Sequence, residues 1–243
     1  DRASGTLRCD PCNVNASMPA DPDPEPRPDG EAAAKLAPGL YLVATPIGNA
    51  RDIGLRALDV LAAADLLAAE DTRHTRRLLE IHGLRRSPRS LVAYHDHNGA
   101  AQRPRLLAAM AEGRSVALVS DAGTPLLADP GWRLAAEAAA AGHMVTAVPG
   151  ASALLAALSI AALPTDRFLF AGFLPPRTAA RRRELSGLAT IPATLVFYES
   201  PRRLAASLAD MAAVLGPARP AALCRELTKR FEEARRGTLG ALA

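Results

Sequence analysis

The sequence predicts an α/β protein with two domains, and two observations carry this prediction. From residue 39 onward, short apolar runs typical of buried strands alternate with segments of helical character. After about residue 150, the strand-like runs become richer in β-forming residues. Strands that alternate with helices favour crossover connections and parallel pairing. We therefore expect an N-terminal α/β domain at 39–150, with helices flanking a mostly parallel sheet, and a mixed-sheet C-terminal α/β domain at 151–243.

The individual elements follow from the local pattern of apolar residues. Strands are expected at residues 40–44, 65–69, 91–94, 115–119, 144–148, 168–173, 193–198 and 220–224. Helices are expected at residues 55–64, at a basic stretch after Thr72, and at 102–112, 131–141, 152–162, 178–188 and 202–215. Asp52 stands just before the first of these helices and is expected to cap it.

Residues 1–38 have a different composition and are expected to form a disordered tail. Prolines recur so closely from Pro19 to Pro28 that neither helix nor sheet fits there. Cys9 and Cys12 form a single C-x-x-C pair in this segment, without the further Cys or His ligands that a zinc site needs. We therefore expect no metal. Met18 is a candidate for the true start residue, and residues 237–240 resemble the start of a further element.

Composition and charge limit the possible functions. The chain has 49% hydrophobic and 22% charged residues, which is typical of a globular protein, and its net charge of +4 permits a nucleic-acid partner. Aromatic residues make up only 4%, which argues against reading RNA mainly by base stacking. No apolar run reaches the roughly 18 residues that cross a bilayer. Three cysteines make no disulfide framework, so we expect a reducing, cytoplasmic location and no membrane.

Polar and small residues follow the carboxyl end of each strand in the first domain. These ends meet at one edge of a parallel sheet, which is where open α/β folds bind ligands. The clusters are Thr45–Asn49, Glu70–Thr72, His95–Asn98, Ser120–Pro125 and Pro149–Ser152. The first of them has one glycine and a proline, so it lacks the backbone N–H groups that cradle a pyrophosphate. Nicotinamide and ATP chemistry are therefore not expected.

An ordered set of motifs carries a resemblance. The motifs are ATPIGN (44–49), AEDTRHTRRLL (69–79), YHDHN (94–98), VSDAGTPLLADPG (119–131), VPGASA (148–153), FYESPRR (197–203) and CRELTK (224–229). The chain resembles, from residue 40 to its end, the two-domain tetrapyrrole-methylase-like class III methyltransferases, and among them those acting on small-subunit ribosomal RNA. The ATPIGN turn differs from the G-x-G-P-G-D of the corrin and porphyrin methylases.

The resemblance implies an activity and its partners. It implies S-adenosylmethionine bound between the two domains, a homodimer, and methyl transfer to the 2′-oxygen of a cytidine in the decoding region of 16S rRNA within the 30S subunit. It implies cofactor contacts at Pro46, Ile47, Gly123, Thr124, Pro125, Leu127, Ser152 and Ala153, with parts of Phe173–Leu174 and Leu223–Cys224. Relatives continue into a further strand pair, so we expect part of the adenine pocket to lie beyond this chain.

Methyl transfer to a ribose hydroxyl needs a group that takes up the leaving proton. A carboxylate or a neutral histidine within hydrogen-bond reach can do this. The candidates at strand ends are Glu70, Asp71, His95, Asp96 and Glu199. Glu70 and His95 are our first choices, with Asn98 and Ser200 orienting the ribose. Simpler roles are open for several of these: helix capping for Glu70, Asp71 and Ser152, and surface or core imidazoles for His95 and His97.

Arginines near these clusters are candidates for binding RNA phosphates. Arg73, Arg76, Arg202 and Arg203 are the principal ones, and Arg77 and Arg181–Arg183 are others. Solvated helix faces are the alternative interpretation. Glu226, Thr228 and Lys229 are expected to form a wall of the site, or Glu226 and Lys229 form a surface ion pair. Two other functions stay open: a corrin or porphyrin methylase, and a non-enzymatic RNA-binding or assembly factor that kept the fold.

Overall fold

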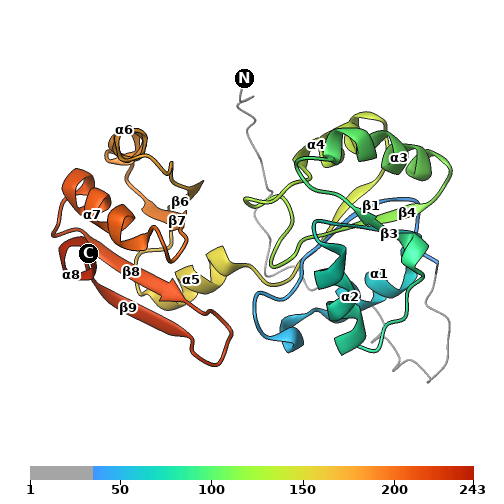
Figure 1. The fold of residues 1–243 in the computed structure, drawn as a ribbon, viewed down its shortest axis with the longest axis horizontal. Helices are drawn as coiled ribbons and strands as arrows, with labels where there is room; N and C mark the ends of the chain where they lie inside the picture. Colours follow the sequence, from blue (N-terminus) through green and yellow to red (C-terminus); the bar gives the residue numbers. More distant parts are fainter. Residues whose placement is uncertain (1–34) are drawn as a thin grey trace, which may run out of the picture. The chain divides into compact units, whose positions relative to one another are not determined.

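A computed structural model of the chain describes residues 35–243 (Figure 1). The predictions for the disordered tail, for Met18 and for the Cys9–Cys12 pair lie wholly or largely outside the described residues. At the boundary of that expected tail, Leu36 packs against the core, and the Tyr41 hydroxyl donates a 3.0 Å hydrogen bond to the Ala37 carbonyl. Residues 35–243 belong to one compact unit.

The observed elements lie close to those expected from the sequence. In chain order they are β1 (Gly39–Val43), η1 (Ala50–Asp52), α1 (Leu55–Ala63), β2 (Leu66–Ala69), α2 (Thr72–Ile81), η2 (Pro88–Ser90), β3 (Leu91–Ala93), α3 (Gly99–Ala111), β4 (Ser115–Val119), α4 (Trp132–Ala140), β5 (Val145–Val148), α5 (Ala153–Ala161), β6 (Phe168–Phe173), α6 (Thr178–Leu188), β7 (Thr194–Tyr198), α7 (Leu204–Leu215), β8 (Pro220–Arg225), β9 (Glu233–Thr238) and α8 (Leu239–Leu242).

The first five strands form a parallel sheet in the order β3-β2-β4-β1-β5. The central strands β2 and β4 are buried along their whole length, as expected of a parallel sheet that helices cover on both faces. Alternation along β1 sends Leu40 to one face and Tyr41 and Val43 to the other. Helices α3 and α4 cover the Leu40 face, and α1 and α2 cover the opposite face (Figure 1).

The later strands pair in both orientations, which agrees with the expected mixed-sheet region. Strands β6 and β7 are parallel, with a register irregularity between Phe170 and Phe173, and β8 and β9 form an antiparallel pair. A separate apolar cluster lies beside these strands and is built on Leu174, Leu185 of α6 and Leu208 of α7. The C-terminal helix α8 adds Leu239 to this cluster.

Two local expectations need correction. Asp52 does not cap α1: it lies in the short helix η1, and the residue before α1 is Gly54, which has no capping side chain. The strand β9 was not expected, because its sequence is charged and lacks the apolar alternation of a half-buried strand. Residues 237–240 end β9 and begin α8, so a further element does start within them, as expected.

Arg181 was a candidate for binding RNA phosphates, and the structure shows that this is wrong. Its side chain is 3% exposed and pairs with the equally buried Asp210 at 2.6 Å, so phosphates cannot reach it. Arg182 contacts the other carboxylate oxygen at 2.6 Å from a half-exposed position. Burial raises the pKa of Asp210, but the hydrogen bonds and charges of Arg182 and Arg181 outweigh it, and the pKa lies below its usual value.

The buried ion pair of Arg181 and Asp210 predicts that two single substitutions will differ strongly in their cost to stability. Asp210→Ala leaves the Arg181 charge buried without its partner and should lower the free energy of unfolding by about 3–5 kcal/mol. Arg182→Ala, the matched control on the exposed side, should cost less than about 1 kcal/mol. Urea unfolding at neutral pH measures both, and equal losses would contradict the assignment. Because the folded-state pKa of Asp210 is lowered, its contribution should disappear as the pH falls below about 4.

Candidate functional site

The carboxyl edge of the parallel sheet brings the distant polar clusters together. The turn after β1 is bonded to the loop after β4 by a pair of backbone hydrogen bonds, each 2.9 Å, between Thr45 and Gly123. The Thr45 hydroxyl also donates to the Ser120 carbonyl at 3.0 Å, and the Ser120 hydroxyl donates to the Gly123 carbonyl at 2.7 Å. These bonds hold the first turn and the β4 loop as one rigid unit.

Small residues line the side of this unit that faces β5. Gly123 has a φ of +88°, and a Cβ there would lie 3.4 Å from the Ile47 methyl group and 3.8 Å from the Ala151 carbonyl. The Thr124 hydroxyl donates to the same Ala151 carbonyl at 3.1 Å. A side chain larger than glycine is therefore strained at position 123, where the buried backbone packs closely against Ile47 and Ala151.

Ser152 directly precedes α5, but its side chain does not cap the helix, so the capping interpretation is wrong. Its side chain makes no capping hydrogen bond. The hydroxyl is buried and has no hydrogen-bond partner within residues 35–243. A buried polar group without a partner costs free energy, and such groups in native proteins often mark a ligand site. Ser152 and the neighbouring Gly123 and Thr124 thus form one candidate binding wall.

The other expected cofactor residues are distributed around the same edge. Pro46 and Ile47 line a pocket between the first turn and α2, and Pro125 lines a small cavity beside Glu70. Leu127 is 39% exposed, and Ala153 is the first residue of α5. These positions remain predictions as cofactor contacts.

The loop after β4 contains backbone strain that the sequence did not reveal. Leu126 and Ala128 both have positive φ, at 74° and 61°. Non-glycine residues rarely adopt this conformation, and strain of this kind concentrates at binding sites and active sites. The strained stretch lies inside the expected cofactor-binding motif.

Glu70 at the end of β2 lies near a second acidic residue that was not among the candidates. Both Glu70 and Asp129 line the small cavity, together with Tyr94 and Ser120. Burial raises the pKa of Glu70, and the charges of Asp121 and other carboxylates add to this. Burial and the Glu70 charge raise the pKa of Asp129 to about 6. The sequence signal for Asp129 was its place in the same motif, but nothing marked it as buried.

In the loop after β3, the candidate residue Asn98 makes hydrogen bonds that stabilise the loop itself. The Asn98 amide accepts a 2.8 Å hydrogen bond from the His95 backbone and donates one of 3.0 Å to the Ala93 carbonyl. His95 keeps its Nδ1 buried without a partner in the part of the chain that is described. A role of Asn98 in orienting a ribose, and of His95 as a base, both remain predictions.

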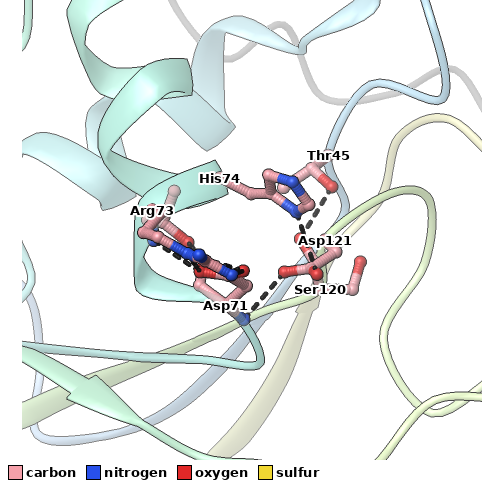
Figure 2. Close-up of polar contacts among 7 residues, drawn as sticks. Thr45, Asp71, Arg73, His74, Ser120 and Asp121 are labelled. Atoms are coloured by element: carbon pink, nitrogen blue, oxygen red, sulfur yellow. Dashed lines mark hydrogen bonds and ion pairs between the residues drawn. The ribbon is translucent and has the colours of Figure 1, made fainter.

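A polar network connects the start of α2 to the β4 loop (Figure 2). Asp71 caps α2 by accepting a 2.8 Å hydrogen bond from the Arg73 backbone, as one interpretation of the sequence expected. Arg73 also binds the Asp71 carboxylate with its guanidinium, which holds the pKa of Asp71 well below its usual range. The Asp121 carboxylate accepts a 2.9 Å hydrogen bond from the Asp71 backbone N–H, and its other oxygen lies 3.0 Å from His74 Nδ1.

In the FYESPRR motif (197–203), Glu199 and Arg203 have their hydrogen bonds and ion pair within the protein. Glu199 is 7% exposed; its carboxylate accepts from the Ser200 backbone at 2.8 Å and from the Ser207 hydroxyl, and it pairs with Arg203 at 3.2 Å. Arg203 also donates to the Leu174 carbonyl. Arg202 is exposed, and so are Arg73 and Arg76 of α2. Both carboxylate oxygens of Glu199 thus have partners within the protein, and its catalytic role remains a prediction.

The CRELTK loop reaches the first turn. The Thr228 hydroxyl accepts a 3.1 Å hydrogen bond from the Asn49 backbone, which supports the expected place of this loop in a wall of the site. Glu226 and Lys229 form the expected surface pair at 3.2 Å. Glu226 and Thr228 both have positive φ, so this loop is strained as well.

Two negative findings apply to residues 35–243. They contain no cluster of three or more His, Cys, Asp or Glu side chains placed to hold a metal ion. Within the same range, no helix is both long and apolar enough to cross a membrane.

The raised pKa of Asp129 predicts a specific pH dependence of stability. A carboxyl whose folded-state pKa is raised favours folding below the ordinary value of about 4, and this contribution is lost as the pH rises to about 6. Asp129→Asn removes the ionisation, so its free energy of unfolding should fall less than that of the wild type between about pH 4 and pH 7. Urea unfolding across this range measures it. Asp52→Asn, at an exposed position, is the control; identical pH curves for wild type and Asp129→Asn would contradict the prediction.

Comparisons with known proteins agree with this geometry. Residues 39–243 match the family model of the tetrapyrrole (corrin/porphyrin) methylases. A protein of Mesorhizobium japonicum named "Ribosomal RNA small subunit methyltransferase I" is 58% identical over 211 residues, which cover 87% of this chain and 71% of that protein. A protein of Escherichia coli O157:H7 with the same name is 50% identical over 203 residues, covering 84% of this chain and 70% of that protein.

Solved structures show the same fold at lower identity. A cobalt precorrin-4 methyltransferase superimposes with a TM-score of 0.62 at 19% identity, covering 84% of this chain and 86% of that one. A diphthine synthase gives a TM-score of 0.64 at 19% identity, with coverage of 84% and 83%. The expected α/β architecture is confirmed. The chain belongs to the tetrapyrrole methylase family.

Proposed function

We propose that this protein transfers a methyl group from S-adenosylmethionine to the 2′-hydroxyl of a cytidine in the decoding region of 16S rRNA. The observation that carries the proposal is the match to relatives named as small-subunit ribosomal RNA methyltransferases, at 58% and 50% identity across more than four fifths of the chain. The strained and open loops at the sheet edge supply a site where the motifs of the match meet.

The residues at the sheet edge fit the cofactor. Ser152 has a buried hydroxyl that lacks a partner in the described part of the chain, and a ligand carboxylate or hydroxyl can satisfy it. Gly123 keeps the β4 loop free of a Cβ where Ile47 and Ala151 approach, so backbone groups can contact a nucleoside closely. Ser152, Gly123, Thr124 and the first turn at Pro46 and Ile47 would hold the cofactor.

When bound, S-adenosylmethionine supplies an electrophilic methyl group on a sulfonium. The protein aligns the acceptor oxygen with that carbon, because orientation provides much of the rate of an in-line displacement. The sheet edge also supplies the half-buried carboxylates of Glu70 and Asp129, whose ionised forms favour a cationic ligand nearby. A base at this edge accepts the proton of the hydroxyl, and Glu70 and His95 stay candidates for it.

Exposed arginines provide the contact with RNA. Arg73 and Arg76 lie on the open side of α2, and Arg202 is exposed before α7. Phosphate contacts of this type give salt-dependent affinity that does not depend on base sequence.

The proposal includes recognition of the rRNA within the 30S subunit, action as a homodimer, and a cytoplasmic location, where ribosomes are assembled.

The role assigned to Ser152 predicts a separable effect on cofactor binding. Ser152→Ala removes a hydrogen bond to the ligand and should weaken binding of S-adenosylmethionine by about 10-fold to 100-fold. The free energy of unfolding without ligand should stay equal or rise, because an unpaired buried hydroxyl is removed. Titration calorimetry and urea unfolding measure the two effects. Ser159→Ala is the matched control in α5, where the hydroxyl is exposed and bonds only the Leu155 carbonyl; an equal loss of affinity there would refute the assignment.

The activity itself is tested with isotopically labelled S-adenosylmethionine and two acceptors, 30S subunits and free 16S rRNA. Label should appear in RNA and, after digestion to nucleosides, in 2′-O-methylcytidine, with the 30S subunit as the better acceptor. Label on base atoms alone would overturn ribose methylation. Label transferred to uroporphyrinogen and not to RNA would place the chain among the small-molecule methylases.

A further inference from the structure

His74 and Asp121 form a pair that the candidate residues did not include. His74 Nδ1 lies 3.0 Å from Asp121 Oδ2, while Asp121 Oδ1 accepts the Asp71 backbone N–H at 2.9 Å (Figure 2). The position of the carboxylate is therefore fixed from the backbone. A carboxylate bound at Nδ1 favours the tautomer that carries its proton there, so the lone pair is left on Nε2. The His74 side chain is 67% exposed, so Nε2 is accessible to a substrate.

His74 and Asp121 lie in the wall of a pocket at the sheet edge. The pocket has a volume of about 450 Å³ and lies between the turn after β1, the loop after β4 and helix α2. Its apolar wall includes Pro46 and Ile47 of the turn and Leu78 and Ile81 of α2, and His74 and Asp121 are among its polar residues. A volume of this size and a mostly apolar lining with a few polar groups are typical of a site for a small organic group.

The charge around the pocket favours a nucleotide as that group. Arg77 lines the pocket, and the exposed Arg73 and Arg76 lie on the same helix. These cations match the phosphates on either side of a nucleotide in an RNA strand. Enzymes that modify a single nucleotide commonly extrude it into such a pocket, where apolar side chains contact the base.

We infer that this pocket receives the nucleoside to be methylated and that His74, positioned by Asp121, is the general base that takes the proton from its hydroxyl. The inference rests on the proposed function and assigns a role within it. The Ser152 side of the edge, with Gly123 and Thr124, is left to the methyl donor, and the first turn borders both sites, because Ile47 approaches Gly123 and also lines the pocket.

The proposed step moves one proton and one methyl group. The hydroxyl O–H bond breaks and its proton passes to His74 Nε2, while the oxygen electron pair forms the new O–C bond. The electron pair of the breaking C–S bond stays on sulfur, which becomes a neutral thioether. His74 is then an imidazolium paired with the Asp121 carboxylate, and its exposed position lets it return the proton to water. Asp121 acts as a positioning residue.

The two earlier candidates for the base are less well placed for this pocket. Glu70 lines the separate small cavity with Asp129 and is not among the pocket-lining residues. His95 does not line the pocket either, and its Nδ1 is buried. His74 alone among these histidine and glutamate side chains both lines the pocket and has a carboxylate that orients it.

The experiment uses the full chain, S-adenosylmethionine and 30S subunits in single-turnover assays. General-base catalysis contributes about 100-fold to 10,000-fold. His74→Ala should therefore lower the transfer rate by at least about 100-fold, and added imidazole should restore part of it. Calorimetric affinity for S-adenosylmethionine should not change. His143→Asn is the matched control, because His143 precedes β5 at the opposite edge of the sheet.

A second variant separates positioning from structure. In Asp121→Asn the side-chain oxygen can still accept the Asp71 backbone N–H, but the amide nitrogen then faces His74 Nδ1 and forces the imidazole proton onto Nε2. Nitrogen-15 NMR of His74 should show the proton on Nδ1 in the wild type and on Nε2 in this variant, together with a similar loss of rate. This readout does not depend on turnover.

The outcomes distinguish the inference from the proposed function. A wild-type protein that binds S-adenosylmethionine but methylates no RNA overturns the proposed function and this inference with it. An active wild type together with an equally active His74→Ala variant overturns the inference alone, and a large loss in Glu70→Gln or His95→Asn would then name the base. A His74 imidazole protonated on Nε2 in the wild type also overturns it.

Discussion

The backbone pairing of Thr45 with Gly123 is the constraint on which the site depends. Two reciprocal hydrogen bonds of 2.9 Å join the turn after β1 to the loop after β4, although the two residues are far apart in sequence. The Ser120 side chain adds a bond to the same glycine carbonyl. Because β1 and β4 are neighbours in the parallel sheet, this pairing extends their contact beyond the strand ends. The loops on either side of it are thereby fixed, and each can form a different wall.

The strained backbone of the loop after β4 persists because the loop is fixed at both ends. Leu126 and Ala128 adopt left-handed backbone conformations that cost of order 1–3 kcal/mol each, and such conformations persist only where the surroundings determine them. The anchored Gly123 begins the loop, and Gly131, with φ +128°, ends it before α4. A Cβ at Gly131 would lie 2.5 Å from a methyl group of the buried Leu118, so only glycine lets the chain pass this close to the core. A loop held at both ends in this way can keep an uncommon shape.

The sequence was sufficient for the fold and for the meeting of the polar clusters at one sheet edge, but not for the contacts among them. Apolar runs such as residues 115–119 predict buried parallel strands, and parallel strands bring their polar ends to one edge, which is why the clusters meet. Strand β9 was missed because its side chains are charged and the pattern has no apolar alternation.

Individual roles depend on burial and partners, which a single sequence does not encode. Arg181 and the exposed Arg182 are adjacent in the same basic run, yet one is buried against Asp210 and the other is half exposed. Asp129 and His74 lie inside motifs that were recognised. Only the three-dimensional contacts show that the Asp129 carboxyl is half-buried at the same cavity as Glu70 and that Asp121 orients the His74 imidazole.

Acidic and basic side chains occupy different regions at this edge of the sheet. Besides burial, the charge of Asp121 raises the pKa of Glu70, and the charges of Glu70 and Asp121 raise that of Asp129, so these carboxylates lie close enough together to make the potential at the edge negative. Such a potential opposes the entry of a phosphate and favours a cationic sulfonium. The exposed arginines Arg73 and Arg76 are on the outer side of α2, where a phosphate can approach without meeting those carboxylates. For the proposed function, the two regions of opposite charge would hold the RNA backbone outside while a neutral ribose and base enter.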